Sequence, residues 1–396
     1  MLIRRHAAAT LLQLAKEYPV VAVTGPRQSG KTTLVRKVFP DKSYVSLEDL
    51  DERQFATDDP RGFLGRYPDG AILDEVQRCP ELFSYLQTRI DQAKKKGLFV
   101  LTGSQQFNLL SGITQSLAGR VALIPLLPFA LSELQAAKMA PKKLSELLFR
   151  GLYPPICDGS HQAGIWYGNY MRTYIERDVR QMINVRDLSA FQRFVRMCAG
   201  RTGQLTNLSA LANDCGVTHN TAKAWLSVLE ASYIVHLLQP HHRNFDKRLV
   251  KTPKLYFCDT GLACWLLGIR APAQLDRHAQ RGALFETWAV GELLKARYNM
   301  GLESNLYFWR DRTGNEVDVV IEEGDKLAPV EIKAGQTVSS DYFRGLDRWQ
   351  GLAKEVSGKA WLLYGGDKGQ SRLGYNVVPW AEIGSFASQL ATDAAK

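Results

Sequence analysis

The sequence predicts a multidomain α/β fold whose first part contains a parallel sheet. Apolar, β-branched runs at residues 18–24, 70–75 and 98–102 alternate with helical stretches, which is the pattern of a buried parallel sheet. The chain has 396 residues, more than one ordinary hydrophobic core accommodates. Beyond residue 137 the order of helical and strand patterns changes, so we expect further domains there.

The composition is that of a globular protein with a basic balance. Hydrophobic residues make up 45% of the chain, and the net charge of +10 favours a polyanionic partner. No run approaches the roughly eighteen apolar residues of a membrane helix, and the first residues lack the pattern of a signal peptide. We therefore expect a cytoplasmic protein without a membrane partner. The six cysteines form no C-x-x-C pair and are expected to be reduced thiols.

A phosphate-binding loop follows the first predicted strand. It has the pattern G-x-x-x-x-G-K-[ST], with a strand before it and a helix after it. Backbone N–H groups of such a loop turn toward phosphates, and the helix N-terminus adds a favourable dipole. We expect Lys31 to reach the β- and γ-phosphates and Thr32 to ligate Mg²⁺. The residues expected to contact the nucleotide are Gly25, Pro26, Arg27, Gln28, Ser29, Gly30, Lys31, Thr32 and Thr33.

Two acids end the second predicted strand. Asp74 is expected to hold Mg²⁺ through water, and Glu75 to act as the base that activates the attacking water. The third strand ends in polar residues, of which Ser104 or Gln105 could sense hydrolysis. The alternative, an ordinary solvated strand end, is weakened by the phosphate-binding loop upstream. The sequence therefore predicts an enzyme that binds and hydrolyses Mg-ATP.

The residues of this nucleotide site resemble the AAA+ superfamily, whose members hydrolyse ATP at subunit interfaces. More closely, the chain resembles, essentially end to end, a prokaryotic family of predicted ATPases that joins an AAA-type core to a conserved C-terminal region of unknown function. The matching stretches are residues 23–32, 73–77, 101–104 and 117–120. That family often has a second serine at the position of Gln105. The resemblance implies a homo-oligomer, such as a hexameric ring. Arg120 is then a candidate for stabilising phosphate charge in its own subunit or a neighbour's; a salt-bridge role is the alternative.

Residues 191–275 predict a winged helix-turn-helix. Two helical segments surround Gly216, Thr218 can cap the second, and strands at 233–238 and 254–258 flank a basic loop. Such modules place the second helix in the DNA major groove. The alternative is a module that contacts protein or covers an ATPase. The candidate DNA-binding residues are His219, Asn220 and Lys223 on the helix and Arg243, Lys247 and Arg248 in the loop.

The last part of the chain carries acids at strand spacing. Glu331 and Lys333 share one face of a predicted strand, and a hairpin would bring Asp318 beside Glu331. The carboxylates could hold Mg²⁺ with helix residue Glu286, while Lys333 orients water. This set resembles the PD-(D/E)XK nuclease superfamily, including Holliday-junction resolvases, and so implies metal-dependent DNA cleavage. A solvent-facing strand, or a nuclease fold that has lost its chemistry, is the alternative.

Together these patterns predict four domains. They are a P-loop AAA+ ATPase core (1–137), a helical lid or linker (138–190), a winged helix-turn-helix (191–275) and an α/β PD-(D/E)XK nuclease-like domain (276–396). The preferred function is an ATPase acting on or with double-stranded or branched DNA. Two alternatives stay open: a nucleotide-gated regulator or scaffold for protein partners, and a toxin or defence protein whose nuclease is restrained by the ATPase.

Overall fold

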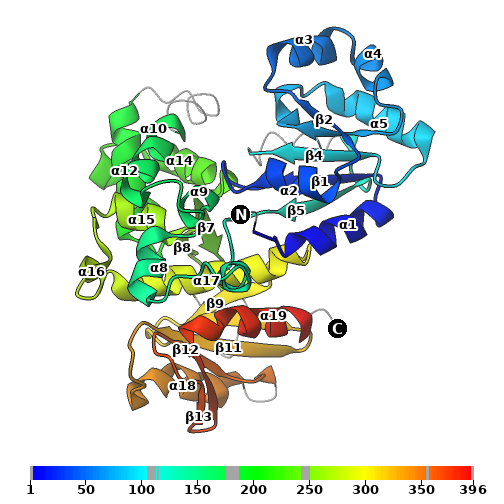
Figure 1. Cartoon of the computed structure of the whole chain (residues 1–396). Helices are drawn as coiled ribbons and strands as arrows, with labels where there is room; N and C mark the ends of the chain where they lie inside the picture. The colour runs from blue at the N-terminus through cyan, green and yellow to red at the C-terminus, as the bar shows by residue number, and fades with distance from the viewer. Residues whose placement is uncertain are drawn as a thin grey trace. The chain divides into compact units, whose positions relative to one another are not determined.

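The computed structural model describes residues 3–104, 113, 116–174, 187–241, 250–353 and 356–393. They fall into two compact units (Figure 1). The first contains residues 1–129, 231–233 and 298–303, and the second contains residues 130–230, 234–297 and 304–396. The finer division into four domains stays a prediction.

The first unit is built on a five-stranded sheet in the order β2-β3-β4-β1-β5 (Figure 1). All neighbouring strands are parallel, which confirms the predicted parallel sheet. Strand β4 lies between β1 and β3, so the loop after β1 and the acids at the end of β3 flank the end of β4. The strands are β1 (Val20–Thr24), β2 (Ser43–Ser46), β3 (Ala71–Asp74), β4 (Phe99–Gly103) and β5 (Val121–Pro125).

Helices cover both faces of this sheet because its strands are apolar on both sides. In β1, Val20 and Ala22 belong to a core shared with α3, α4 and α5, whereas Val21 and Val23 belong to a core shared with α1 and α2. Because both faces are covered, the polar site of the described residues lies at the ends of the strands. The helices are α1 (Ala7–Glu17), α2 (Lys31–Val38), α3 (Leu50–Asp58), α4 (Pro60–Gly65), the 3-10 helix η1 (Val76–Arg78) and α5 (Leu82–Ala93).

The second unit begins with helices and a small antiparallel sheet in the order β6-β8-β7. Residues 175–186, which the sequence predicts to continue the helical region, lie outside the described residues. The elements are α7 (Leu131–Ala136), α8 (Leu144–Arg150), α9 (Pro154–Cys157), α10 (Ala163–Tyr174), α12 (Leu188–Gly200), β6 (Gln204–Leu205), α13 (Leu208–Cys215), α14 (His219–Ala231), β7 (Val235–Leu238), β8 (Lys254–Phe257), α15 (Thr260–Leu266) and α16 (Pro272–Leu275).

A six-stranded sheet in the order β13-β14-β12-β11-β10-β9 completes the second unit (Figure 1). Strands β9, β10 and β11 pair antiparallel, and β11, β12 and β14 pair parallel. The elements are α17 (Arg281–Asn299), β9 (Leu306–Arg310), β10 (Glu316–Glu323), β11 (Lys326–Lys333), η3 (Ser340–Phe343), α18 (Arg344–Ala353), β12 (Trp361–Tyr364), β13 (Gln370–Arg372), β14 (Tyr375–Pro379), η5 (Trp380–Glu382) and α19 (Ile383–Asp393).

Candidate functional site

Two glycines give the loop between β1 and α2 a backbone conformation that residues with a side chain rarely adopt. Gly25 has a φ of 141°, and a Cβ there would lie 2.2 Å from the carbonyl oxygen of Leu126. Gly30 has a φ of 92° and precedes the first residue of α2. Lys31 is buried, and its ammonium donates to the carbonyls of Gly25 at 3.0 Å and Pro26 at 2.8 Å. The lysine therefore folds over its own loop, where a phosphate would accept the same hydrogen bonds.

Asp74 collects three hydroxyl donors at the end of β3. Thr32 Oγ1 lies 2.9 Å from Asp74 Oδ2, and the Tyr44 hydroxyl lies 2.7 Å from the same oxygen. Thr102, in β4, donates to Asp74 Oδ1. Burial and the bond to Asp74 raise the pKa of Tyr44 to about 12, so this hydroxyl stays a donor at neutral pH. Thr32 and Asp74 thus lie together, as a magnesium-nucleotide site requires.

Glu75 is held beside the end of β4. Its backbone has a φ of 55°, and its N–H donates to Thr102 Oγ1 at 3.3 Å. Ser104 Oγ and Gln77 Nε2 donate to Glu75 Oε2 at 3.0 and 2.6 Å. The structure therefore brings Ser104 to the predicted base, whereas Gln105 lies outside the described residues.

Arg5 supports the loop from a position that the sequence did not single out. The buried guanidinium donates to the carbonyls of Ser29 at 2.8 Å and Leu127 at 2.6 Å, and it stacks 4.7 Å from the Phe129 ring centroid. The Ser29 hydroxyl is buried, with no hydrogen-bond partner among the described residues. No local pattern around Arg5 predicts this role, because its partners lie far along the chain.

Arg120 lies at the other edge of the sheet. It directly precedes β5, and its carbonyl accepts a hydrogen bond from the N–H of Val20, the first residue of β1. The phosphate-binding loop, in contrast, follows the last residue of β1. Its guanidinium makes a bidentate pair with Asp91, at 2.7 and 3.0 Å. The five residues of β1 span about 16 Å between the edge where Arg120 lies and the edge where the loop begins. Arg120 therefore does not reach the loop of its own subunit. The geometry matches the salt-bridge alternative, and a role at a neighbouring subunit stays a prediction.

Helices α13 and α14 enclose a tight turn as expected. Gly216 ends α13 with a φ of 68°, and Thr218 Oγ1 accepts from the N–H of Thr221 at 3.1 Å. The candidate residues His219, Asn220 and Lys223 are exposed on α14. A groove of about 660 Å³ beside them is lined by His219, Lys223 and Lys251, and no acid is among its described lining residues. Arg243, Lys247 and Arg248 lie outside the described residues.

The predicted C-terminal residues also come together. Lys333 Nζ lies 3.2 Å from Asp318 Oδ2 and 2.5 Å from Glu331 Oε1, and the N–H of Ile332 donates to Asp318 at 2.8 Å. Glu331 Oε2 is buried and has no partner among the described residues. Glu286, from α17, affects the electrostatics of the same cluster. Strand parity and the β10–β11 hairpin account for this convergence.

Lys254, which the sequence analysis did not select, enters this acid cluster from β8. It is 2% exposed, and its ammonium lies 3.1 Å from Glu286 Oε1 and pairs with Glu316. Burial and the charge of Asp318 raise the pKa of Glu286 to about 7 and that of Glu331 to about 8. Burial opposes the charge of Lys333, but Asp318 and Glu331 outweigh it and raise the pKa of that ammonium.

A divalent ion does not fit the acid cluster in this arrangement. The ammonium groups of Lys254 and Lys333 already pair with the carboxylates of Glu286, Asp318 and Glu331. Among the described residues, no group of three or more His, Cys, Asp or Glu side chains has the arrangement of a metal site. The expected metal ligands are therefore adjacent, but as partners in ion pairs.

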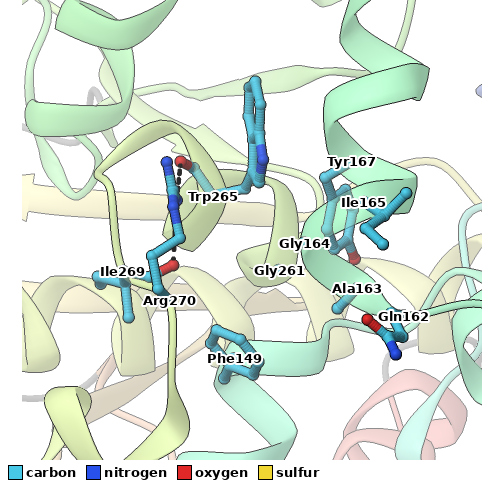
Figure 2. A pocket seen from close by; sticks show the side chains of 10 residues that line it. All are labelled: Phe149, Gln162, Ala163, Gly164, Ile165, Tyr167, Gly261, Trp265, Ile269 and Arg270. Atoms are coloured by element: carbon cyan, nitrogen blue, oxygen red, sulfur yellow. Dashed lines mark hydrogen bonds between the residues drawn. The ribbon is translucent and has the colours of Figure 1, made fainter.

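A separate pocket of about 310 Å³ lies between α10 and α15 (Figure 2). Its wall includes Tyr167, Trp265 and Arg270, and the Arg270 guanidinium donates to the carbonyls of Trp265 at 2.9 Å and Ile269 at 3.2 Å. Both bonds come from Nη1 of the guanidinium, and we assign no ligand to this pocket.

Comparison with known proteins divides the chain into three matched regions. Residues 17–135 match a family described as an AAA domain. Residues 141–273 match a domain of unknown function (DUF8612), and residues 281–383 match a domain of unknown function (DUF4143). Uncharacterized protein Rv2008c of Mycobacterium tuberculosis is 33% identical over 341 residues, which cover 85% of this chain and 75% of the relative. Uncharacterized protein Mb2031c of Mycobacterium bovis matches to the same extent.

The chain belongs to the family of these two mycobacterial proteins. The match to an AAA domain and the geometry of the loop identify this chain as an AAA-type P-loop ATPase, which confirms the prediction of an ATPase core. The winged-helix and nuclease-like assignments stay predictions. In the part of the chain that the structure describes, no helix is long and apolar enough to cross a membrane.

Two solved structures show a weaker similarity. The Walker-type ATPase PABY2304 of Pyrococcus abyssi aligns with 67% of this chain and 96% of its own, at 14% identity and a TM-score of 0.47. AMPPCP-bound DnaA from Aquifex aeolicus aligns with 57% of this chain and 85% of its own, at 14% identity and a TM-score of 0.30. These TM-scores are too low to support an inference about the function of this protein.

Proposed function

We propose that the chain is a magnesium-dependent ATPase that acts on or with DNA. The observation that supports the chemistry is the convergence of Lys31, Thr32, Asp74, Glu75 and Ser104 around the ends of three strands. Thr32 and, through water, Asp74 would hold Mg²⁺, which supplies charge neutralisation to the phosphates. Lys31 would exchange its loop carbonyls for the β- and γ-phosphates.

Glu75 is the proposed base for in-line attack of water on the γ-phosphate. Ser104 and Gln77 donate to one oxygen of its carboxylate, Oε2, so the carboxylate is oriented and its Oε1 can receive a proton. Ser104 also lies at the end of β4, between the loop and the acids, which suits a residue that responds to loss of the γ-phosphate.

The DNA part of the proposal is supported by charge and exposure. His219, Asn220 and Lys223 form an exposed face of α14, and the adjacent groove adds Lys251 without an opposing acid among its described lining residues. A basic surface of this kind attracts a phosphate backbone. We further propose that the ATPase works as a homo-oligomeric ring in the cytoplasm, with Arg120 serving a neighbour's site.

ATP turnover with and without linear, forked and four-way-junction DNA tests this function. We expect DNA to stimulate turnover several-fold, and Glu75→Gln to abolish turnover while ATP still binds. Lys223→Gln should weaken DNA binding and reduce the slope of log affinity against log salt by about 1. Lys142→Gln, an exposed lysine elsewhere in the second unit, is the matched control.

The alternatives predict different results. Turnover that ignores every DNA, together with no DNA binding at low salt, would overturn the DNA-directed function and favour a regulator of protein partners. A nuclease restrained by the ATPase would instead cause toxicity on overexpression that Asp318→Ala removes.

A further inference from the structure

A lysine at the centre of an acid cluster needs a physical reason. Lys254 is 2% exposed, and burying an ammonium is unfavourable unless anions compensate. Here Glu286 and Glu316 pair with it directly, and Asp318 adds to the negative field around it. The Tyr256 hydroxyl, two residues along β8, lies 2.5 Å from the same Glu286 oxygen. The acids therefore compensate the buried ammonium, and the ammonium offsets part of their negative charge.

The backbone delivers this ammonium to a fixed place. Lys254 is the first residue of β8, where it pairs with Leu205 of β6 on one side and Leu238 of β7 on the other. Its side chain also lies 5.6 Å from the centroid of the Phe308 ring. Because β8 is hydrogen-bonded on both sides, its backbone is fixed. The ammonium can therefore move away from the acids only by rotation of the Lys254 side chain.

One carboxylate oxygen of the cluster remains without compensation. Glu331 is 7% exposed, and its Oε2 has no hydrogen-bond partner among the described residues. A buried carboxylate oxygen without a donor is unfavourable as an anion, so a cation or a proton beside it is stabilising. The cluster thus combines ligands suited to a hard cation with an ammonium already present among them.

We propose that Lys254 is a tethered counter-ion that excludes divalent cations from the cluster of Glu286, Asp318 and Glu331. Ammonium and metal ion compete for the same carboxylates, so only one of them occupies the cluster at a time. Rotation of the Lys254 side chain out of the cluster, or its removal by substitution, frees the carboxylate of Glu286. Lys333 then remains as the ammonium paired with Asp318 and Glu331, so a divalent cation competes with one ammonium instead of two. This inference does not depend on the ATPase or on DNA.

Mn²⁺ binding to the full, nucleotide-free chain tests the competition. Free Mn²⁺ is followed by electron paramagnetic resonance after treatment with EDTA and dialysis. We expect no Mn²⁺ bound at the cluster in the wild type. Lys254→Met should gain one site, with Mn²⁺ affinity raised at least about tenfold because a full positive charge has been removed from contact distance. Adding Asp318→Asn should abolish that site.

The controls separate charge competition from unfolding. Lys251→Met removes an exposed lysine near the start of the same strand and should gain no Mn²⁺. Lys254→Met with Glu316→Gln removes one charge of each sign, so it keeps the net charge of the cluster, and it should still gain the site if Lys254→Met alone fails to fold. Wild-type Mn²⁺ binding that Asp318→Asn removes, or no gain in either Lys254 variant, would overturn the proposal.

Discussion

Asp74 and Asp318 are chemically identical side chains in two different electrostatic settings. Both are nearly buried, at 6% and 8% exposed. Asp74 accepts hydrogen bonds from the hydroxyls of Thr32, Tyr44 and Thr102. Hydroxyl donors carry no formal charge, so the carboxylate keeps its full negative charge for an incoming cation.

Asp318 accepts instead from a backbone N–H and from the ammonium of Lys333, with the charge of Lys254 close by. These cations offset part of the negative charge of the cluster before any metal arrives. The comparison shows that the presence of acids in a pattern does not define a metal site; the charge of their hydrogen-bond donors decides whether a cation is still needed.

The largest expected effect separates the two aspartates directly. Asp74→Asn should lower ATP turnover by at least about 100-fold, because the magnesium-nucleotide site loses its charge. Asp318→Asn, the matched substitution in the second unit, should leave turnover within about twofold of the wild type. Steady-state phosphate release measures both. Comparable losses in the two variants would contradict the assignment of ATP chemistry to Asp74 alone.

Tyr44→Phe tests the importance of the hydroxyl donors around Asp74. The hydroxyl lies 2.7 Å from Asp74 Oδ2, and a hydrogen bond to a charged group is worth enough to change turnover about tenfold. We expect slower hydrolysis and a higher Mg²⁺ requirement. Tyr85→Phe, in the same unit, is the control and should behave as wild type. An unchanged Mg²⁺ dependence in Tyr44→Phe would show that the remaining hydroxyls suffice.

Glu331→Gln tests the acid cluster through pH. Burial and Asp318 raise the pKa of Glu331 from 4.5 to about 8 in the folded state, so the folded chain binds more protons than the unfolded chain in that window. Its contribution to stability is therefore present at low pH and is lost as pH rises toward 8. In EDTA, Glu331→Gln should reduce this decline by about 1 kcal/mol or more. Urea unfolding between these pH values measures it; parallel pH profiles would contradict the shift.

Arg120→Ala should produce the smallest effect on a single subunit. The Arg120–Asp91 pair is exposed and contributes little to stability. We expect a nearly unchanged melting temperature and unchanged nucleotide binding at low concentration. Turnover that falls only at concentrations where the chain assembles would locate Arg120 at a neighbour's site. No loss at any concentration would leave Arg120 as a salt-bridge residue.

The sequence predicts the centre of the ATP site because its determinants are local. Gly25, Gly30 and Lys31 form one continuous pattern, and Asp74 and Glu75 end one apolar strand. Strand parity likewise predicts that Glu331 and Lys333 share a face, and the hairpin brings Asp318 to them.

The residues that the sequence analysis missed act across long separations. Arg5 reaches Ser29 and Leu127, Tyr44 reaches Asp74, and Lys254 reaches Glu286. No periodicity in one segment encodes such pairs, because they depend on which strands become neighbours. Lys254 is the first residue of a predicted strand, and nothing in the local sequence distinguishes it. The tertiary structure reveals that its side chain enters an acid cluster.

The strand order of the first unit has a consequence for biosynthesis. β1 is the earliest strand in the chain, yet its hydrogen-bonded neighbours β4 and β5 begin only at Phe99 and Val121. The ribosome must therefore release most of this unit before β1 can pair, and its apolar residues stay unprotected for that period. Non-local pairing of this kind also slows folding. The ATP-binding loop, which begins directly after β1, therefore reaches its final geometry only after the chain has been translated beyond β5, although the loop itself is translated early.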